Sequence, residues 1–382
     1  MERGLRWLII LGVLVFAVVG VAGAQSPAVV LDGGALLAGD SFADGPRSGV
    51  AFTERKTING IKVPFASQPV GSISAVMRGW FSGTWAILTD KGFGDQPSSD
   101  FMLRIYLVEV DLRRANGGAG AVNILDWVTL SDPRKQIKGT ITLATDKTRP
   151  LTGAEFNPIS LARGTNSTLW VADAAGNSLL HFARDGALLE APRTLSTGAL
   201  LAMSAVPGGA TLVLAVRNGD QVAIRTYDPA ANKLADRALT YSLESSANTV
   251  SELTMLNSTQ ALILEQDRAR GTSAKTKLVY LYDLSSGQKQ LLADLMNIND
   301  AGNLVNTGVF GASKSLFGLT GPFRYPLDLS GVYPVDGTTL LIVNNNHFPF
   351  DTARANGLPD RTEFITVKLG NPLTLQLKDD QQ

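Results

Sequence analysis

A repeated pair of apolar segments constrains the fold of this chain more than any other feature of the sequence. In each pair a short apolar run is followed by a turn and by a second run that opens at Thr. The five pairs are 72–77 with 84–90, 158–162 with 168–173, 200–206 with 211–216, 250–256 with 259–265, and 329–335 with 338–344. A third, alternating run follows, most clearly at 178–182, 221–227 and 277–284. Short runs bounded by turn residues predict β-strands.

Repeated sheets of three or four strands cannot bury both faces alone, so they have to pack on one another around an axis. The sequence therefore predicts an all-β fold, a β-propeller of about six four-stranded blades. The Thr residues that open the second strands are 84, 43, 48 and 79 residues apart. Two steps match a blade of roughly 40 to 50 residues, and the other two hold either an insertion or a weaker blade.

Five blades are visible, and six is the count that we prefer. The sixth would combine residues 50–65 with the strands 363–369 and 373–377, which would close the ring and remove its free edges. The best helix candidate lies within 290–297, and 116–120 reads as a flexible hairpin tip.

The N-terminal residues predict a secretory signal peptide. Arg3 and Arg6 precede an apolar run, 7–21, that ends at the small residues 22–24. We expect cleavage after Ala24, which gives a protein that is secreted, extracellular or periplasmic, without stable membrane insertion. The alternative is an uncleaved anchor, because the run is long for a signal peptide but short of the roughly 20 residues of a span. Residues 25–378 would form a single propeller domain, and 379–382 a disordered tail.

The composition limits the remaining partners. There is no cysteine, which excludes a lipidated-cysteine anchor and a disulfide framework. Without residues 1–24 the chain keeps 32 Lys and Arg against 33 Asp and Glu, so nothing in the charge favours nucleic acid. We expect a monomer that takes a small-molecule or anionic ester substrate.

Polar residues follow the second strands of the repeat. Aligning the repeats makes Asp90, Asp173, Glu265 and Asn344 equivalent on one rim, with Arg217 just past the end of another second strand. Carboxylate and amide oxygens from several blades suit Ca²⁺, which takes six to eight oxygen ligands. A cation there would bind and polarise a phosphate. The alternative is that Asp and Asn end these strands because their side chains form turns.

Three segments are richer in polar residues and glycine than the repeat requires: 89–106, 168–182 and 340–364. In that order, and with 151–160 and 251–267 between them, they resemble the phytase-like family of secreted bacterial proteins, which are often described as having esterase-like activity. The matching residues are Asp90, Gly92, Phe93, Gly94, Asp100, Phe101, Arg104, Trp170, Val171, Asp173, Gly176, Glu265, Asp267, Asn344, Asn346, Phe348, Pro349 and Phe350.

The resemblance implies a propeller with a calcium-dependent site and hydrolysis of phosphate or other esters. The implied metal ligands are Asp90, Asp173, Glu265, Asp267, Asn344 and Asn346. The chain departs from the family at acidic positions, where it has Ala174, Asn345, Ile159 and, on a looser alignment, Ser330. Either the metal site is weakened and the protein only binds a ligand, or the remaining Asp90, Asp95, Asp173, Glu265 and Asp267 suffice.

The candidates for catalysis are few. No G-x-S-x-G motif is present, and the chain has two histidines. His181 alternates with apolar residues and reads as an ordinary strand residue, whereas His347 follows the Asn run at the rim. Two histidines without cysteine disfavour zinc. His347 and Arg104 are therefore the catalytic candidates, and Lys91, Arg104 and Arg217 are the candidates for binding a phosphate.

Two hypotheses remain. The first is a secreted calcium-dependent hydrolase of phosphate or other esters that acts at the tunnel mouth. The second is a non-catalytic extracellular binding propeller whose metal site has lost several carboxylates.

Overall fold

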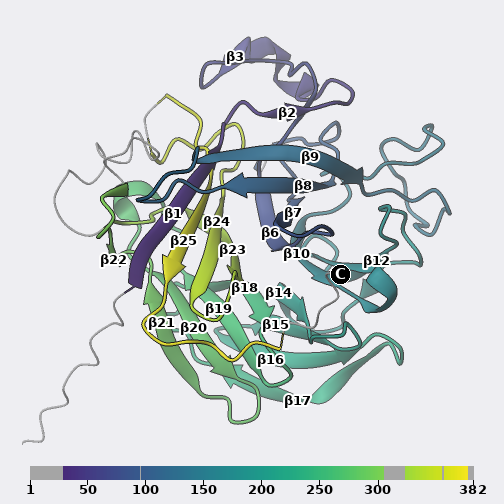
Figure 1. Ribbon diagram of the computed structural model, residues 1–382. Helices are drawn as coiled ribbons and strands as arrows, with labels where there is room; N and C mark the ends of the chain where they lie inside the picture. Colours follow the sequence, from purple (N-terminus) through teal and green to yellow (C-terminus); the bar gives the residue numbers. More distant parts are fainter. Residues whose placement is uncertain (1–28, 95, 305–322, 355–356, 377–382) are drawn as a thin grey trace, which may run out of the picture.

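The computed structural model describes residues 29–94, 96–304, 323–354 and 357–376, and within them nearly all regular secondary structure is strand (Figure 1). Four sheets are formed by consecutive strands. They are β6 (Ile73–Arg78), β7 (Thr84–Thr89), β8 (Arg104–Asp111) and β9 (Ala121–Thr129); β10 (Pro158–Arg163), β11 (Leu169–Asp173), β12 (Ser178–Phe182) and β13 (Arg193–Thr194); β14 (Ala199–Ala205), β15 (Leu212–Asn218), β16 (Gln221–Asp228) and β17 (Lys233–Tyr241); and β18 (Thr249–Met255), β19 (Gln260–Gln266), β20 (Lys277–Asp283) and β21 (Lys289–Asp294).

The fifth sheet joins the two ends of the chain. It contains β23 (Asp328–Pro334), β24 (Thr339–Asn345), β25 (Thr362–Lys368) and the first strand, β1 (Val29–Leu37), which runs antiparallel to β25. A single parallel pair, Leu36 with Ala121, links β1 to β9 of the first sheet. The remaining elements are short: η1 (Val50–Arg55), η2 (Thr165–Ser167), η3 (Gly271–Ser273), β2 (Phe42–Ala43), β3 (Thr57–Ile58), β4 (Ile61–Lys62), β5 (Gln68–Pro69) and β22 (Ile298–Asn299).

The five sheets form a closed ring, which confirms the predicted propeller. The first strands contact one another in the cyclic order β6, β10, β14, β18, β23 and again β6. Each second strand is buried because sheets pack on both of its sides, and one hydrophobic cluster fills each of the five interfaces between neighbouring sheets.

The expected composition of a sixth blade is wrong. Residues 50–65 form η1 and the hairpin of β3 and β4, not a blade strand. The strand at 363–369 belongs to the fifth sheet as β25, and 373–376 forms no strand although the Leu373 amide donates to the Gly337 carbonyl at 2.6 Å. The ring is closed by β1, whose hydrogen bonds to β25 could not be seen from a repeat that begins after it.

The helix expected within 290–297 is also wrong. Residues 289–294 form β21, which pairs with β20, and a turn follows at 295–296. The apolar spacing of this short run fits either structure, and pairing with β20 decides for the strand. The tip at 116–120 lies in the turn between β8 and β9, where Arg114 and Gly117 exchange backbone hydrogen bonds.

The segment between β1 and β6 covers the first and fifth sheets with aromatic side chains. Phe52 and Phe65 contact Phe93, with ring centroids 5.1 and 5.7 Å apart, and Phe65 also contacts Phe348. Phe93 is fully buried in a left-handed conformation, with φ at 50°. The glycine-flanked loop that the sequence marks as a site is therefore held by a buried aromatic anchor. No helix in the described parts of the chain is long and apolar enough to cross a membrane.

Candidate functional site

The register of the sheets shows which residues are equivalent around the ring. Every first strand has one bulge at the same place, and the residue before it pairs with Thr89, Asp173, Val216, Glu265 or Asn344. Asp90 comes one residue later, so its equivalents are Ala174, Arg217, Gln266 and Asn345. The expectation that Asp90 aligns with Asp173, Glu265 and Asn344 is wrong by one residue, and a shift of one residue in a strand reverses the face to which a side chain points.

The bulges also show where in the fold the departures from the family pattern lie. The extra residues of two first strands are Ile159 and Ser330, and Ala174 and Asn345 are equivalents of Asp90. All four positions where the resemblance leads us to expect an acid thus belong to two sets of equivalent positions at the same end of the ring. We refer to this end, where the first strands begin and the second strands finish, as the rim.

Asp173, Glu265 and Asn344 are fully buried; Asp173 and Asn344 bond within their own sheets, and Glu265 also joins its sheet to the preceding one. The Asp173 carboxylate accepts hydrogen bonds from the amides of residues 157, 175 and 176 and from the Ser178 hydroxyl. Glu265 accepts from the Tyr241 hydroxyl at 2.9 Å, the residue 244 amide and Asn248 Nδ2, and it pairs with Lys289. Asn344 bonds to the backbone at residues 361 and 363. Their side-chain oxygens therefore already accept hydrogen bonds from protein groups.

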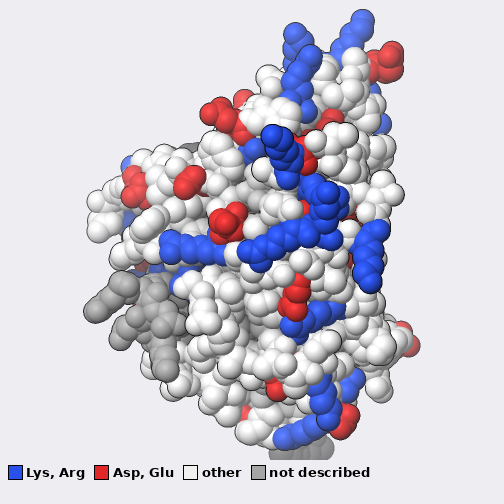
Figure 2. Space-filling view, turned by 90° about the vertical axis from the view of Figure 1, so that its right-hand side faces the viewer, with Lys and Arg blue, Asp and Glu red and all other residues white. Residues whose placement is uncertain are grey.

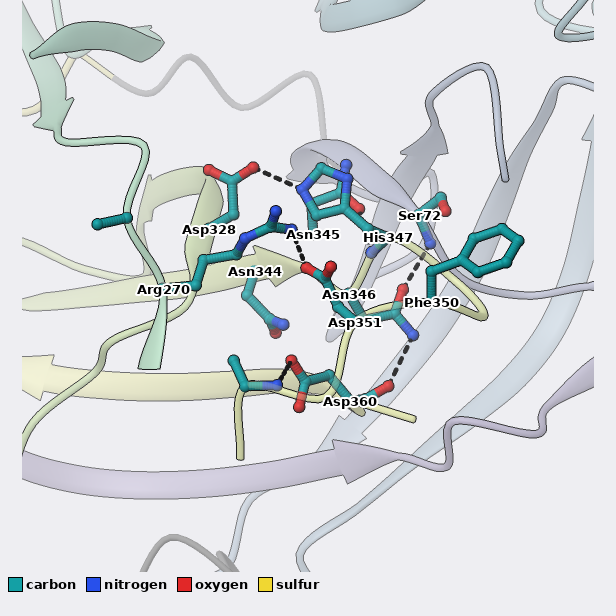
Figure 3. Close-up of polar contacts among 12 residues, drawn as sticks. Ser72, Arg270, Asp328, Asn344, Asn345, Asn346, His347, Phe350, Asp351 and Asp360 are labelled. Atoms are coloured by element: carbon teal, nitrogen blue, oxygen red, sulfur yellow. Dashed lines mark hydrogen bonds and ion pairs between the residues drawn. The ribbon is translucent and has the colours of Figure 1, made fainter. Parts of the chain in front are cut away.

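Figure 3 shows a polar cluster on the fifth sheet, in which Asp328 and His347 contact each other. Asn345 Nδ2 donates to Asp90 Oδ2 at 2.6 Å, and the Gly92 amide donates to Asp90 Oδ1 at 2.6 Å. His347 Nε2 lies 2.6 Å from Asp328 Oδ2, and the His347 amide donates to Asn345 Oδ1. We call Asp90, Asp328, Asn345 and His347 the rim cluster.

Burial and neighbouring charges shift the pKa values in the rim cluster. Burial raises the pKa of Asp90, against the opposing effects of His347 and Asn345. Burial disfavours the charged form of His347, but the hydrogen bond to Asp328 and the charges of Asp328, Asp90 and Asp351 outweigh it, so the pKa of His347 is raised. The same pair lowers the pKa of Asp328 despite its burial. The cluster therefore favours an imidazolium paired with a carboxylate.

The loop after β24 is fixed around the cluster by further pairs. Asn346 accepts a hydrogen bond from the Ser72 amide at 2.7 Å and donates to the Asp360 carbonyl at 3.0 Å. Asp351 forms an ion pair with Arg270 from the loop after β19. The side chains of this loop therefore position His347, and Asn346 is one of the residues that holds the loop.

Several rim side chains link one sheet to the next. Arg217 donates to the Asn248 carbonyl at 2.6 Å, and Gln266 donates to Asp328 Oδ1 at 2.8 Å and to the Leu329 carbonyl at 2.7 Å. Asn345 reaches Asp90 in the same way. In three sheets the residue equivalent to Asp90 thus forms a direct hydrogen bond to the following sheet.

The other predicted site residues are dispersed. Arg104 opens β8 opposite Thr89, is 3% exposed and stands over the Trp127 ring, and it bonds to Thr89 and Met102 and not, among the described residues, to the rim cluster. Lys91 is half-buried beside Asn157, toward which its amide points. Asp267 is bound by the residue 275 and 276 amides and pairs with Lys277 at 3.1 Å. His181 stacks on Trp170 and contacts Glu190, as expected of a strand residue. Asp95 lies outside the described residues.

The candidate calcium ligands at the rim are engaged by protein donors. Both carboxylate oxygens of Asp90 and the amide oxygens of Asn344 and Asn346 accept hydrogen bonds from protein groups. The carboxylate of Asp328 contacts Gln266 and His347. His347 and Arg270 bring positive charge to the same place. Among the described residues no group of three His, Cys, Asp or Glu is arranged to hold a metal.

Some residues of the site could not be found from the sequence. The sequence signal for Asp328 is weak: it stands directly before the apolar run of β23. Arg270 and Asp351 lie in loops without any repeat, so only the fold brings them to His347.

Fold and site together define a β-propeller with a polar rim. The family model described as "Phytase-like: Esterase-like activity of phytase" matches residues 68–348, and the chain belongs to this family. No curated protein sequence matches it.

Solved structures give only distant similarity. The chain is similar to the luciferin-regenerating enzyme (TM-score 0.39, 9% identity, 92% of this chain and 99% of that one) and to the Dos1 propeller (0.35, 10%, 82% and 71%). It is also similar to hydrazine synthase of Kuenenia stuttgartiensis (0.37, 10%, 74% and 59%), so it spans less than two thirds of that chain.

Proposed function

We propose that this protein is a binding propeller of the phytase-like family that takes a small anionic ester at the rim without depending on calcium. The observation that carries the proposal is the set of protein donors that already occupies the rim oxygens. A calcium-dependent hydrolase needs several free carboxylates at one place. Here the rim has an imidazolium and a guanidinium, each paired with a carboxylate, beside several amides, and such N–H groups bind anions and esters by hydrogen bonds.

The distribution of surface charge supports an anionic ligand. The formal net charge is zero, yet Figure 2 shows a band of Lys and Arg side chains across one side of the molecule, with fewer Asp and Glu between them. A local positive field raises the concentration of small anions near a surface and speeds their association. The N-terminal pattern supports action outside the cytoplasm, after cleavage at Ala24.

The pair of His347 and Asp328 favours a second candidate, hydrolysis of esters without a metal. A histidine oriented by a carboxylate is the arrangement that acid–base catalysis uses. In this candidate a water molecule attacks the phosphorus or carbonyl carbon, and the bond to the alcohol oxygen breaks as the imidazolium of His347 donates its proton to the leaving oxygen. The proton that the attacking water gives up returns to the imidazole of His347. The raised pKa of His347 suits the donor.

Calcium titration of the chain 25–382 tests the first proposal. We expect the same unfolding temperature in 5 mM calcium and in excess chelator, and binding of phenyl phosphate by calorimetry in both. A ligand at a hundred times its dissociation constant adds about 2.7 kcal/mol to the free energy of unfolding. A calcium-induced rise of that size, or binding of phenyl phosphate only with calcium, would overturn the proposal.

The second candidate is tested by assaying p-nitrophenyl phosphate and p-nitrophenyl acetate in chelator. We expect turnover to fall at least a hundredfold in His347→Gln and Asp328→Asn, because general acid catalysis contributes roughly 10²- to 10⁴-fold. Glu109→Gln on the exposed part of β8 serves as the control. Binding of phenyl phosphate without turnover would leave the binding function and reject the hydrolase.

A further inference from the structure

The opposite end of the ring contains a cavity that the rim does not use. Each first strand begins at the rim and ends here, about 20 Å away for six or seven residues. The cavity has a volume of about 340 Å³ and is lined by the last residues of all five first strands, among them Arg78, Arg163, Ala205, Met255 and Tyr333. It therefore lies on the axis of the propeller, where five backbones position its walls.

Two arginines are fixed in this wall by backbone carbonyls. Arg78 donates through Nη2 to the carbonyls of residues 334 and 335, and its guanidinium lies 4.3 Å from the Trp85 ring centroid. Arg163 donates through Nη2 to the carbonyls of Arg78 and Gly79, both at 3.2 Å. In each arginine only Nη2 forms these hydrogen bonds, and because their acceptors lie on the neighbouring sheet, that sheet positions the guanidinium.

The positive charge of the two arginines is not neutralised by a direct carboxylate contact. Among the ion pairs of the described residues none includes Arg78 or Arg163. Asp336 is the acid whose charge acts on Arg78, and its own carboxylate accepts from the amide and hydroxyl of Thr338. Burial lowers the pKa of Arg78 and Asp336 opposes that effect, so an additional anion would be favoured beside it.

Part of the rest of the wall is apolar, and Ser204, Thr254 and Gln376 add polar groups. Met77, Leu161, Ala162, Val206 and Met255 line the cavity together with the ring of Tyr333. Methionine adapts its shape to varied apolar ligands. A ligand that fits must therefore present an anionic group to the arginines and an apolar body to the methionines.

We propose that this cavity, which we call the axial pocket, is a binding site for a small amphiphilic monoanion with a carboxylate or phosphate head and an apolar body. Guanidinium groups bind both heads in the same two-pronged way. The site is independent of the rim because different residues at the other end of the first strands form it. Its occupant would lie against all five sheets.

The experiment is calorimetry of octanoate with the chain 25–382, compared with octanol and inorganic phosphate. We expect octanoate to bind at least tenfold more tightly than either, since only octanoate offers both the head and the body. Equal binding of octanol would show that the arginines do not recognise the ligand. Equal binding of phosphate would show that the apolar wall does not. Either result overturns the proposal.

Variants locate the binding. Arg163→Gln removes one charge, and Ala205→Phe fills the pocket without changing charge. Both should weaken octanoate binding at least tenfold, and Arg163→Lys should recover part of it. The matched control is Arg225→Gln, because Arg225 on β16 also donates to a carbonyl, that of Ala235, but lies outside the pocket. If Arg163→Gln fails to fold, Ala205→Phe still decides, and unchanged binding in a folded variant contradicts the site.

Discussion

At the scale of single residues, Glu265 shows what a buried acid does in this fold. It is fully buried and receives hydrogen bonds from three groups while pairing with Lys289. We expect Glu265→Ala to lower the free energy of unfolding by about 3 to 5 kcal/mol, because removing one partner leaves a buried charge and several donors without acceptors. Urea unfolding measures the loss.

The control for this prediction is Glu109→Ala on the exposed part of β8, which should change stability by less than about 0.5 kcal/mol. The variant Glu265→Ala, like the unmodified chain, should unfold at the same temperature in calcium and in chelator. A loss below 1 kcal/mol, or a change in calcium binding, would make Glu265 a ligand and not a structural residue.

His347 gives the stability a dependence on pH. Its pKa is raised in the folded protein, so its contribution is fully present below about pH 6.5, the unfolded value, and is lost as the pH rises through the folded value. Asp328 has a lowered pKa, so its contribution is lost only as the pH falls through that lower value. The pair therefore stabilises most between these limits.

We expect His347→Gln to cost about 1.5 to 3 kcal/mol near pH 6 and clearly less near pH 9. Urea unfolding across this range measures the difference. Asp90 and Asp351, whose pKa values burial raises, also face His347, so Asp328→Asn is the needed comparison. A difference that grows from pH 6 to pH 9 would contradict the assigned pair.

At the scale of elements, β6 and β23 lie so close together that little side-chain volume can be added between them. A Cβ added to Gly331 would lie 2.5 Å from Val76 Cγ1, and the β-branched valine has little freedom to move. We expect Gly331→Ala to cost about 1 to 3 kcal/mol by overpacking this contact. Gly139→Ala is the control, since no atom lies within 4 Å of its added Cβ. Equal unfolding midpoints for the two variants would show that the first strands can separate.

Elements inside the repeat were predictable, and those outside it were not. All five strand pairs are confirmed because turn residues and apolar runs fix them locally. The strand β1 and the strand nature of β21 depend on pairing with segments that the local pattern does not reveal. The register failed at Asp90 because the second strands end at different distances from their bulges, which only hydrogen bonding shows.

At the scale of the whole molecule, the sequence indicated the end of the ring at which the rim cluster lies but not all of its residues. Asp90, Asn345 and His347 meet in this cluster, whereas Arg104 bonds to Thr89 and Met102. The partners Asp328, Arg270 and Asp351 come from separate segments, so their contacts depend on closure of the ring. The missing acids could be recognised only by resemblance, and their placement in two equivalent sets needed the structure.

Restoring acids at the rim should therefore create a calcium site. Asp90, Ala174 and Asn345 are equivalent residues of three consecutive sheets, and Asn345 Nδ2 lies 2.6 Å from Asp90 Oδ2. In Ala174→Glu with Asn345→Asp, like charges would repel one another until a cation binds. We expect calcium to bind at least tenfold more tightly than to the unmodified chain, and the variant to unfold at lower temperature in chelator.

Calorimetry and thermal unfolding in calcium or chelator measure both effects. The matched control is Ala119→Glu with Asn123→Asp, which adds the same charges on the exposed part of the first sheet, where Asn123 also contacts a carboxylate, that of Glu109. Because the control changes charge but not the rim, calcium should leave its unfolding temperature unchanged. If calcium affects both variants alike, general charge and not the ring of equivalent positions accounts for the response.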